Sequence, residues 1–166
     1  MAIQRRLTVS FDEVFPHGAG LVSTVEPCRD FKRSSRDVVV QEVVRDEVGQ
    51  PVLVDGEQQA IWQVEVLDGD EAVTGEAKKV KVKIVAVRRP VPPAAVAGTP
   101  FRPVVLDGLS VQAWVNRDRC RVEQGKPHSC GARQTWSYWA TGLRPVNEGQ
   151  ARERTTSGAG NGREGR

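Results

Sequence analysis

Alternation of apolar and polar residues is the clearest pattern in this chain. In residues 79–86, valine, isoleucine and alanine occupy every second position, and lysine fills most of the others. Residues 60–67 alternate in the same way, with Trp62, Val64 and Val66 sharing one face. A period of two is typical of a strand that packs one face on a core and leaves the other in solvent. Both segments are therefore predicted to be half-buried strands.

Weaker versions of the same pattern predict further strands, and no segment has a convincing helical period. In the second half of the strand predicted at 100–116, the odd positions from Leu109 to Val115 are expected to face the core. A turn or bulge is expected at Asp107–Gly108 and a hairpin turn at 68–71, because both contain Asp-Gly. The proline-rich stretch 88–100 is not expected inside a sheet. The other predicted strands are 20–31, 38–44, 51–54 and 135–146.

About five main strands, few or no helices and two long loops (88–100 and 117–133) predict an all-β fold. We expect a small five-stranded OB-like barrel, with SH3-like barrels and β-sandwiches as alternatives. The predicted domain covers residues 20–146, preceded by an N-terminal extension at 1–19. Residues 147–166 have almost no apolar content, which predicts a disordered polar tail.

Charge is distributed unevenly although the net charge is only +3. Residues 37–77 contain eleven acidic and one basic residue, a net −10, whereas residues 78–145 contain thirteen basic and three acidic residues, a net +10. A basic sheet suggests contact with phosphate. The alternative is that the two halves neutralise each other across the fold.

The predicted location is the cytoplasm. Three cysteines form no disulfide framework, and neither a signal peptide nor an apolar membrane span is apparent.

Nucleic-acid binding is the leading functional prediction, because single-strand binders combine a cationic groove with aromatic side chains that stack on bases. Trp114 would lie near the lysine face if its strand were a neighbour of 79–86. The last strand carries Trp136 and Tyr138 on one face and Trp139 on the other. The ordinary alternative is that tryptophans fill the core and strand lysines discourage edge pairing. The candidate contacts are Lys79, Lys81, Lys83, Arg88, Arg89, Arg102, Trp114, Arg117, Arg119, Arg133, Trp136 and Tyr138.

Metal binding and catalysis have less support. Cys120, His128 and Cys130 fall within one loop, but no C-x-x-C pair accompanies them, so they are weak metal candidates. A reversible Cys120–Cys130 disulfide is a further alternative. No nucleophile elbow, phosphate-binding loop or dinucleotide fingerprint occurs. We therefore predict a non-catalytic protein without a cofactor.

Residues 98–114, GTPFRPVVLDGLSVQAW, carry most of a family resemblance that covers about residues 20–145. In these turns and strand ends the chain resembles small actinobacterial regulatory proteins, whose genes lie beside replication, transfer and excision genes of plasmids and integrative elements. The resemblance implies an OB-like barrel tied to mobile-element DNA. The chain departs from the family pattern at the cysteine-bearing loop 117–133 and at the polar tail.

The sequence therefore predicts a protein that binds nucleic acid, with single-stranded DNA as the first candidate, or that regulates a mobile element. The alternative is an adaptor whose acidic segment 37–77 docks a basic replication or transfer protein. A small redox or metal switch at Cys120, His128 and Cys130 is a third class. No membrane partner is expected.

Overall fold

The computed structural model describes residues 6–121, 124–125, 127–128 and 130–146. Strands form most of the regular structure in these residues, with two short helical segments. The elements are β1 (Leu7–Thr8), α1 (Phe11–Val14), β2 (Ala19–Leu21), β3 (Glu26–Pro27), β4 (Leu53–Val54), β5 (Glu57–Gln58), β6 (Ala60–Asp68), the 3₁₀ helix η1 (Gly75–Lys78), β7 (Lys79–Ala86), β8 (Arg102–Asp107), β9 (Ser110–Asn116), β10 (Arg133–Ala140) and β11 (Gly142–Pro145).

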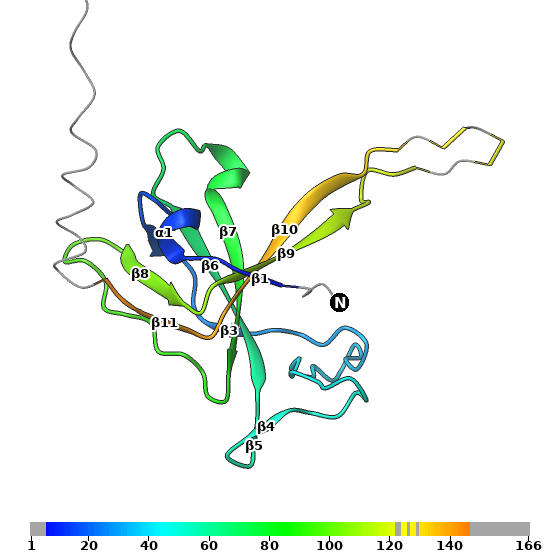
Figure 1. The fold of residues 1–166 in the computed structure, drawn as a ribbon, viewed down its shortest axis with the longest axis horizontal. Coiled ribbons are helices and arrows are strands. Elements are labelled where there is room, and N and C mark those ends of the chain that lie inside the picture. The colour runs from blue at the N-terminus through cyan, green and yellow to red at the C-terminus, as the bar shows by residue number, and fades with distance from the viewer. Residues whose placement is uncertain (1–5, 122–123, 126, 129, 147–166) are drawn as a thin grey trace, which may run out of the picture.

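One curled sheet contains nine of the described strands, in the order β1-β9-β10-β7-β6-β2-β8-β11, with β3 paired to β6. Strands β4 and β5 form a separate small hairpin. In Figure 1, β9 and β10 leave the body of the molecule as a long hairpin. The prediction of a mostly β fold is confirmed, in the form of a half-barrel. The five-stranded closed barrel is not confirmed, because β1 and β11 are the two ends of the sheet order.

The centre of the sheet is the antiparallel pair β6 and β7, which is in register over eight residues of each strand from Ala60↔Ala86 to Leu67↔Lys79. Val64 lies opposite Val82, and both side chains are buried. Each apolar side chain of this size contributes about 1.5–3 kcal/mol on full burial. The predicted core face of these two strands is therefore confirmed.

The N-terminal part of the described chain belongs to this core. Ser10 and Glu13 form a capping box, in which each side chain accepts a hydrogen bond from the backbone N–H of the other residue. The cap starts α1, whose Phe11 packs against Phe15 with ring centroids 5.3 Å apart. Both phenylalanines are buried. Residues 7–19, predicted from the sequence to be an extension, thus contribute β1, α1 and three core side chains, those of Phe11, Phe15 and Ala19.

The predicted inner face of residues 109–115 is wrong at its far end, at Ala113 and Val115. Leu109 is buried, but Ala113 and Val115 are exposed. Only residues 138–140 of β10 pair with β7, so the hairpin leaves the sheet and no core covers its outer part. Apolar and polar residues continue to alternate along β9, but its outer part packs against no core among the described residues.

Two predicted turns have different outcomes. The hairpin turn at 68–71 is wrong, because residues 69–78, including η1, connect β6 to β7. The turn at Asp107–Gly108 is confirmed, since Gly108 has a φ of 58° and joins β8 to β9.

The predicted tail at 147–166 lies outside the described residues. In the described part of the chain, no helix has the length and hydropathy needed to cross a membrane.

Candidate nucleic-acid interface

Lys79, Lys81 and Lys83 project from the side of β7 opposite the core, which we call the outer face. The three lysines differ in their surroundings. Lys81 forms an ion pair with Glu65 at 3.7 Å, and Lys83 forms one with Glu42 at 3.0 Å. Among the described residues, Lys79 has no acidic partner within 4 Å. Two of the three lysines are therefore already ion-paired with acidic residues of segment 37–77.

The aromatic neighbour of this lysine row is Trp139, not Trp114. Strand β10 lies between β7 and β9 and runs parallel to β7, with Trp139 in register with Lys83. Lys83 Nζ lies 4.9 Å from the centroid of the Trp139 ring. The expectation that the strand of Trp114 borders residues 79–86 is therefore wrong.

A second cation lies on the same indole. The Arg6 guanidinium carbon is 3.6 Å from the Trp139 ring centroid, which is a close cation–π contact. Burial lowers the pKa of Arg6, and the nearby Glu42 carboxylate opposes that shift. The indole Nε1 of Trp139 is buried without a hydrogen-bond partner among the described residues. Packing and cation–π contacts, rather than a polar partner, therefore hold Trp139 in place.

Beside Trp139, the outer face is hollowed into an open concavity of about 830 Å³, which we call the basic concavity. Six cationic and two acidic side chains line it, so its charge is strongly positive. Phe31 stands at the same surface with 81% of its area exposed. The charged side chains of the lining are Arg6, Arg29, Lys32, Arg33, Arg45, Lys83, Asp30 and Glu42.

Much of this lining comes from the five-residue segment 29–33, RDFKR. Asp30 organises it as an Asx turn, because its carboxylate Oδ1 accepts hydrogen bonds from the backbone N–H groups of Lys32 and Arg33. The Arg29 guanidinium carbon lies 5.6 Å from the centroid of the Phe31 ring. The Nη2 group of Arg29 donates a hydrogen bond to the Ser35 carbonyl. The turn thereby presents an aromatic ring among three cations.

A hydrogen-bonded group forms the inner wall of the concavity. The Cys28 thiol donates to Glu42 Oε2 at 3.1 Å, and Lys83 Nζ donates to the same oxygen at 3.0 Å. Burial raises the pKa of Cys28 to about 11, and the hydrogen bond to Glu42 adds to the increase. Cys28 is therefore a protonated donor near neutral pH rather than a nucleophile.

The two predicted stacking tryptophans on the hairpin lie on opposite faces. Trp114 is 44% and Trp136 43% exposed. In the antiparallel pair, Trp114 lies opposite Thr135 and Trp136 lies opposite Ala113. Since faces alternate along β10, Trp114 shares the outer face with Trp139, whereas Trp136 does not. The outer face thus carries aromatics both at the concavity and on the hairpin.

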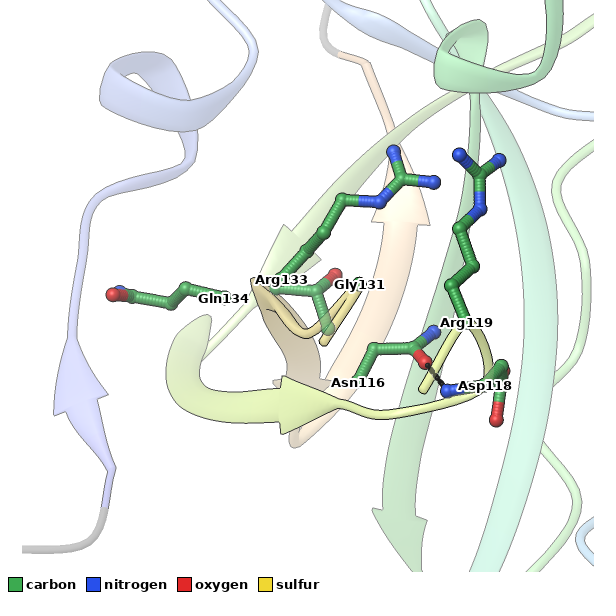
Figure 2. A pocket seen from close by; sticks show the side chains of 7 residues that line it. Asn116, Asp118, Arg119, Gly131, Arg133 and Gln134 are labelled. Carbon is green, nitrogen blue, oxygen red and sulfur yellow. Dashed lines mark hydrogen bonds between the residues drawn. The ribbon is translucent and has the colours of Figure 1, made fainter. Parts of the chain in front are cut away.

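Near its tip, the hairpin holds a second hollow, of about 410 Å³. Arg119 and Arg133 line it, and Figure 2 shows their side chains extending in the same direction from the two arms of the hairpin. Asn116 lies between them, and its Oδ1 accepts a hydrogen bond from the backbone of Asp118 at 2.8 Å. The structure therefore brings these two predicted arginines together, about 20 Å along β10 from Trp139.

Other predicted contacts lie elsewhere. Arg88 forms an ion pair with Glu57 at 3.7 Å, and Arg89 is exposed just after β7. Arg102 belongs to β8, four strands from β10, and donates to the Pro93 carbonyl at 2.7 Å. Arg117 is exposed in the hairpin loop.

Tyr138 lies on the core side of β10 and packs 6.5 Å from the ring centroid of Phe15. Partial burial raises its pKa, and the charge of Asp68 raises it further. As it stands, Tyr138 is placed for packing rather than for stacking on a base.

Sequence reasoning missed Trp139, Arg6 and the cations of the basic concavity. In the sequence, Trp139 is marked only by its place on the face opposite Tyr138. The segment 29–33 does carry a usable signal, because three cations and one aromatic occur within five residues. This segment lies outside the strongly basic half of the chain, so charge distribution alone does not point to it.

The weak metal candidates do come together. The ligand atoms of Cys120, His128 and Cys130 all lie within 4.8 Å of one another, and the two sulfurs are 3.8 Å apart.

Comparison with known protein families, curated proteins and solved structures finds no match for this chain. The resemblance of residues 98–114 to actinobacterial regulatory proteins therefore stays a prediction.

Proposed function

We propose that the protein is a non-catalytic binder of single-stranded nucleic acid, with single-stranded DNA as the first candidate, and that the strand lies in the basic concavity. The observation that carries the proposal is the composition of this surface. An exposed phenylalanine and an Arg6–Trp139 stack stand among six cations and two acids. Cationic tracks with stacking aromatics are how proteins hold single strands without reading sequence.

In this proposal the phosphates contact Arg29, Lys32 and Arg33, and one base stacks on Phe31. A second base stacks on the exposed side of the Arg6 guanidinium, as planar arginine groups do on bases. Lys83 contributes less than the sequence suggests, because Glu42 already occupies its ammonium group. Lys81 faces Glu65, and the hollow around it also contains Glu26, which disfavours phosphate.

The outer face offers a path from the concavity onto the hairpin. Ser137 and Thr135 continue from Trp139 along β10, and Trp114 lies opposite Thr135. Arg119 and Arg133 stand at the far end of this path. Binding along the strands of a curled sheet and its connecting loops is the mode used by OB folds, and the OB-like barrel belongs to this proposal. The link to a mobile element rests on the sequence resemblance alone.

Binding is tested by titrating the full chain with a short single-stranded oligonucleotide and following tryptophan fluorescence at several salt concentrations. Affinity should fall with salt, by about 0.7 logarithmic units per phosphate contact for each tenfold increase. The Arg29→Ala/Arg33→Ala variant should lower the slope by about 1.4. The matched control, Arg88→Ala/Arg89→Ala, removes the same charge away from the concavity and should leave most of the slope intact.

Stacking is tested separately with Phe31→Ala. Loss of one stacked base should weaken binding by about 1–3 kcal/mol without changing the salt slope. Equal effects of the two double-arginine variants, with no effect of Phe31→Ala, would mean that only bulk charge attracts the oligonucleotide and would remove the concavity as the site.

A second function is favoured by a different surface. The acidic segment 37–77 exposes several aliphatic side chains, which is unusual for a purely solvated region. Charge and apolar area together suit an adaptor that docks a basic protein of replication or transfer. In that case oligonucleotides alone give no fluorescence change, and binding requires the partner. The exposed residues include Val38, Val39, Val48 and Leu53.

A further inference from the structure

We infer that the hairpin loop between β9 and β10 binds one Zn²⁺ ion through Cys120, His128 and Cys130. This site lies apart from the basic concavity, and the inference does not rest on the proposed nucleic-acid binding. Its three residues offer two sulfur ligands and one imidazole nitrogen, which is the ligand chemistry that zinc prefers.

The distance between the two sulfurs carries the inference. Two sulfurs bound at about 2.3 Å to one tetrahedral ion lie about 3.8 Å apart. The Cys120 and Cys130 sulfurs are 3.8 Å apart in the structure. A disulfide instead requires about 2.05 Å. The two free thiols are therefore in contact but not bonded, at a spacing that also suits two ligands of one ion.

The position of His128 completes a three-ligand set. A tetrahedral zinc site with sulfur at about 2.3 Å and nitrogen at about 2.0 Å places these atoms about 3.5 Å apart. All three ligand atoms already lie within 4.8 Å of one another, so the imidazole nitrogen has to approach each sulfur by no more than about 1.3 Å to reach that spacing. The fourth tetrahedral position is left for a water molecule.

The surrounding loop supplies a reason for a metal cross-link. Cys120 and Cys130 lie on the two arms of the loop, where exposed side chains provide no core. The arms approach closely at Gly131, where an added Cβ would stand 2.7 Å from the Cβ of Arg119. Small units without a core are commonly stabilised by a structural metal.

Zinc binding at this site adds no net charge to the loop. Binding converts two thiols to thiolates and releases two protons to the buffer. One Zn²⁺ with two thiolates and a neutral imidazole has no net charge. Any change in oligonucleotide affinity on zinc loading therefore comes from the shape of the loop rather than from a new positive charge.

The test uses the full chain, reduced and stripped with a chelator, and titrated with Co²⁺ followed by Zn²⁺. Co²⁺ should give a thiolate charge-transfer band and tetrahedral visible bands at one ion per chain, and Zn²⁺ should abolish them. Zinc affinity is then measured by competition with a chromophoric chelator. Cys120→Ser, Cys130→Ser and His128→Asn should each weaken zinc binding by roughly 100-fold.

The chain supplies its own controls, because its remaining cysteine and histidine are Cys28 and His17. Cys28→Ala and His17→Asn should bind zinc like the unchanged protein. Circular dichroism should show the three loop variants folded, since the loop lies outside the core, and His17→Asn folded, since His17 is exposed. Cys28→Ala removes one small buried side chain, and its spectrum should likewise be that of the folded protein. Absence of the charge-transfer band, its survival at full intensity in Cys120→Ser or Cys130→Ser, or its loss in Cys28→Ala would overturn the inference. Unchanged zinc affinity in His128→Asn would overturn the three-ligand set.

Discussion

Replacing Phe15 by alanine should destabilise the fold far more than its place near the N-terminus suggests. The side chain is 1% exposed and packs against Phe11 and Tyr138. Removal of a buried phenylalanine costs about 3–5 kcal/mol. Two aromatic neighbours place Phe15→Ala in the upper half of that range, at about 4–5 kcal/mol. That is a large share of the free energy of unfolding of a whole domain, which is ~5–15 kcal/mol.

The assay is urea unfolding of the full chain, followed by circular dichroism and tryptophan fluorescence. The free energy of unfolding falls by about 2 kcal/mol per molar urea, so the urea concentration at the unfolding midpoint should fall by roughly 2 M in Phe15→Ala. Phe31→Ala is the matched control, because Phe31 is largely exposed, and it should change stability by less than about 0.5 kcal/mol. A loss below about 1.5 kcal/mol for Phe15→Ala would refute the reasoning and would return residues 1–19 to the role of an extension.

Two further predictions concern Cys28 and Gly108. The pKa of Cys28 is raised from an ordinary 9.0 to about 11 in the folded protein, so its contribution to stability is complete below pH 9 and is lost as the pH rises through 11. Urea midpoints of the unchanged protein and of Cys28→Ala should therefore converge between about pH 8 and pH 11, and parallel curves would contradict this. Gly108→Ala should cost at least about 1–2 kcal/mol because of the positive φ, and its new Cβ would meet Thr141. Thermal unfolding should show a fall in Tm of several degrees, partly recovered by adding Thr141→Ala, and an unchanged Tm would rule out the left-handed turn.

Strands β6 and β7 could be predicted from the sequence because their pattern is local and two-sided. Each places apolar residues at every second position, and burial of one face requires that register. The same reasoning was misleading at Ala113 and Val115. Apolar and polar residues still alternate there, but this part of the hairpin extends beyond the core. A sequence pattern alone does not show where a sheet ends.

The N-terminal helix does have a signal in the sequence. Ser10 and Glu13 have the spacing of a capping box, and Phe11 and Phe15 are four residues apart, on one helical face. A helix of only four residues gives too short a period to be recognised by hydrophobic pattern. Its membership of the core depends on tertiary contact with β8 and Tyr138.

The candidate site was harder to predict because strand order brings it together. The parallel pairing of β10 with β7 places Trp139 beside Lys83, although 56 positions separate them in the chain. No local pattern specifies which strand will be inserted between β7 and β9. The concavity also depends on the irregular segment from Cys28 to Arg45, which is held to β6 by isolated backbone hydrogen bonds such as that from Ile61 to the Glu42 carbonyl.

The charge asymmetry of the chain can now be interpreted residue by residue. Three cations of the basic segment, including Lys81 and Lys83, form ion pairs with acids of segment 37–77. An exposed pair of this kind contributes only about 0–1 kcal/mol, so a phosphate could displace the carboxylate from Lys81 at small cost. The displaced Glu65 would nevertheless stay close and repel that phosphate. In the turn at 29–33, Arg33 lies 3.9 Å from Asp30, whereas Arg29 and Lys32 have no acidic partner within 4 Å among the described residues. In the lysine row, only Lys79 lacks such a partner among those residues. A phosphate should therefore gain more from the turn at 29–33 than from the lysine row, although that row is the more prominent feature of the sequence.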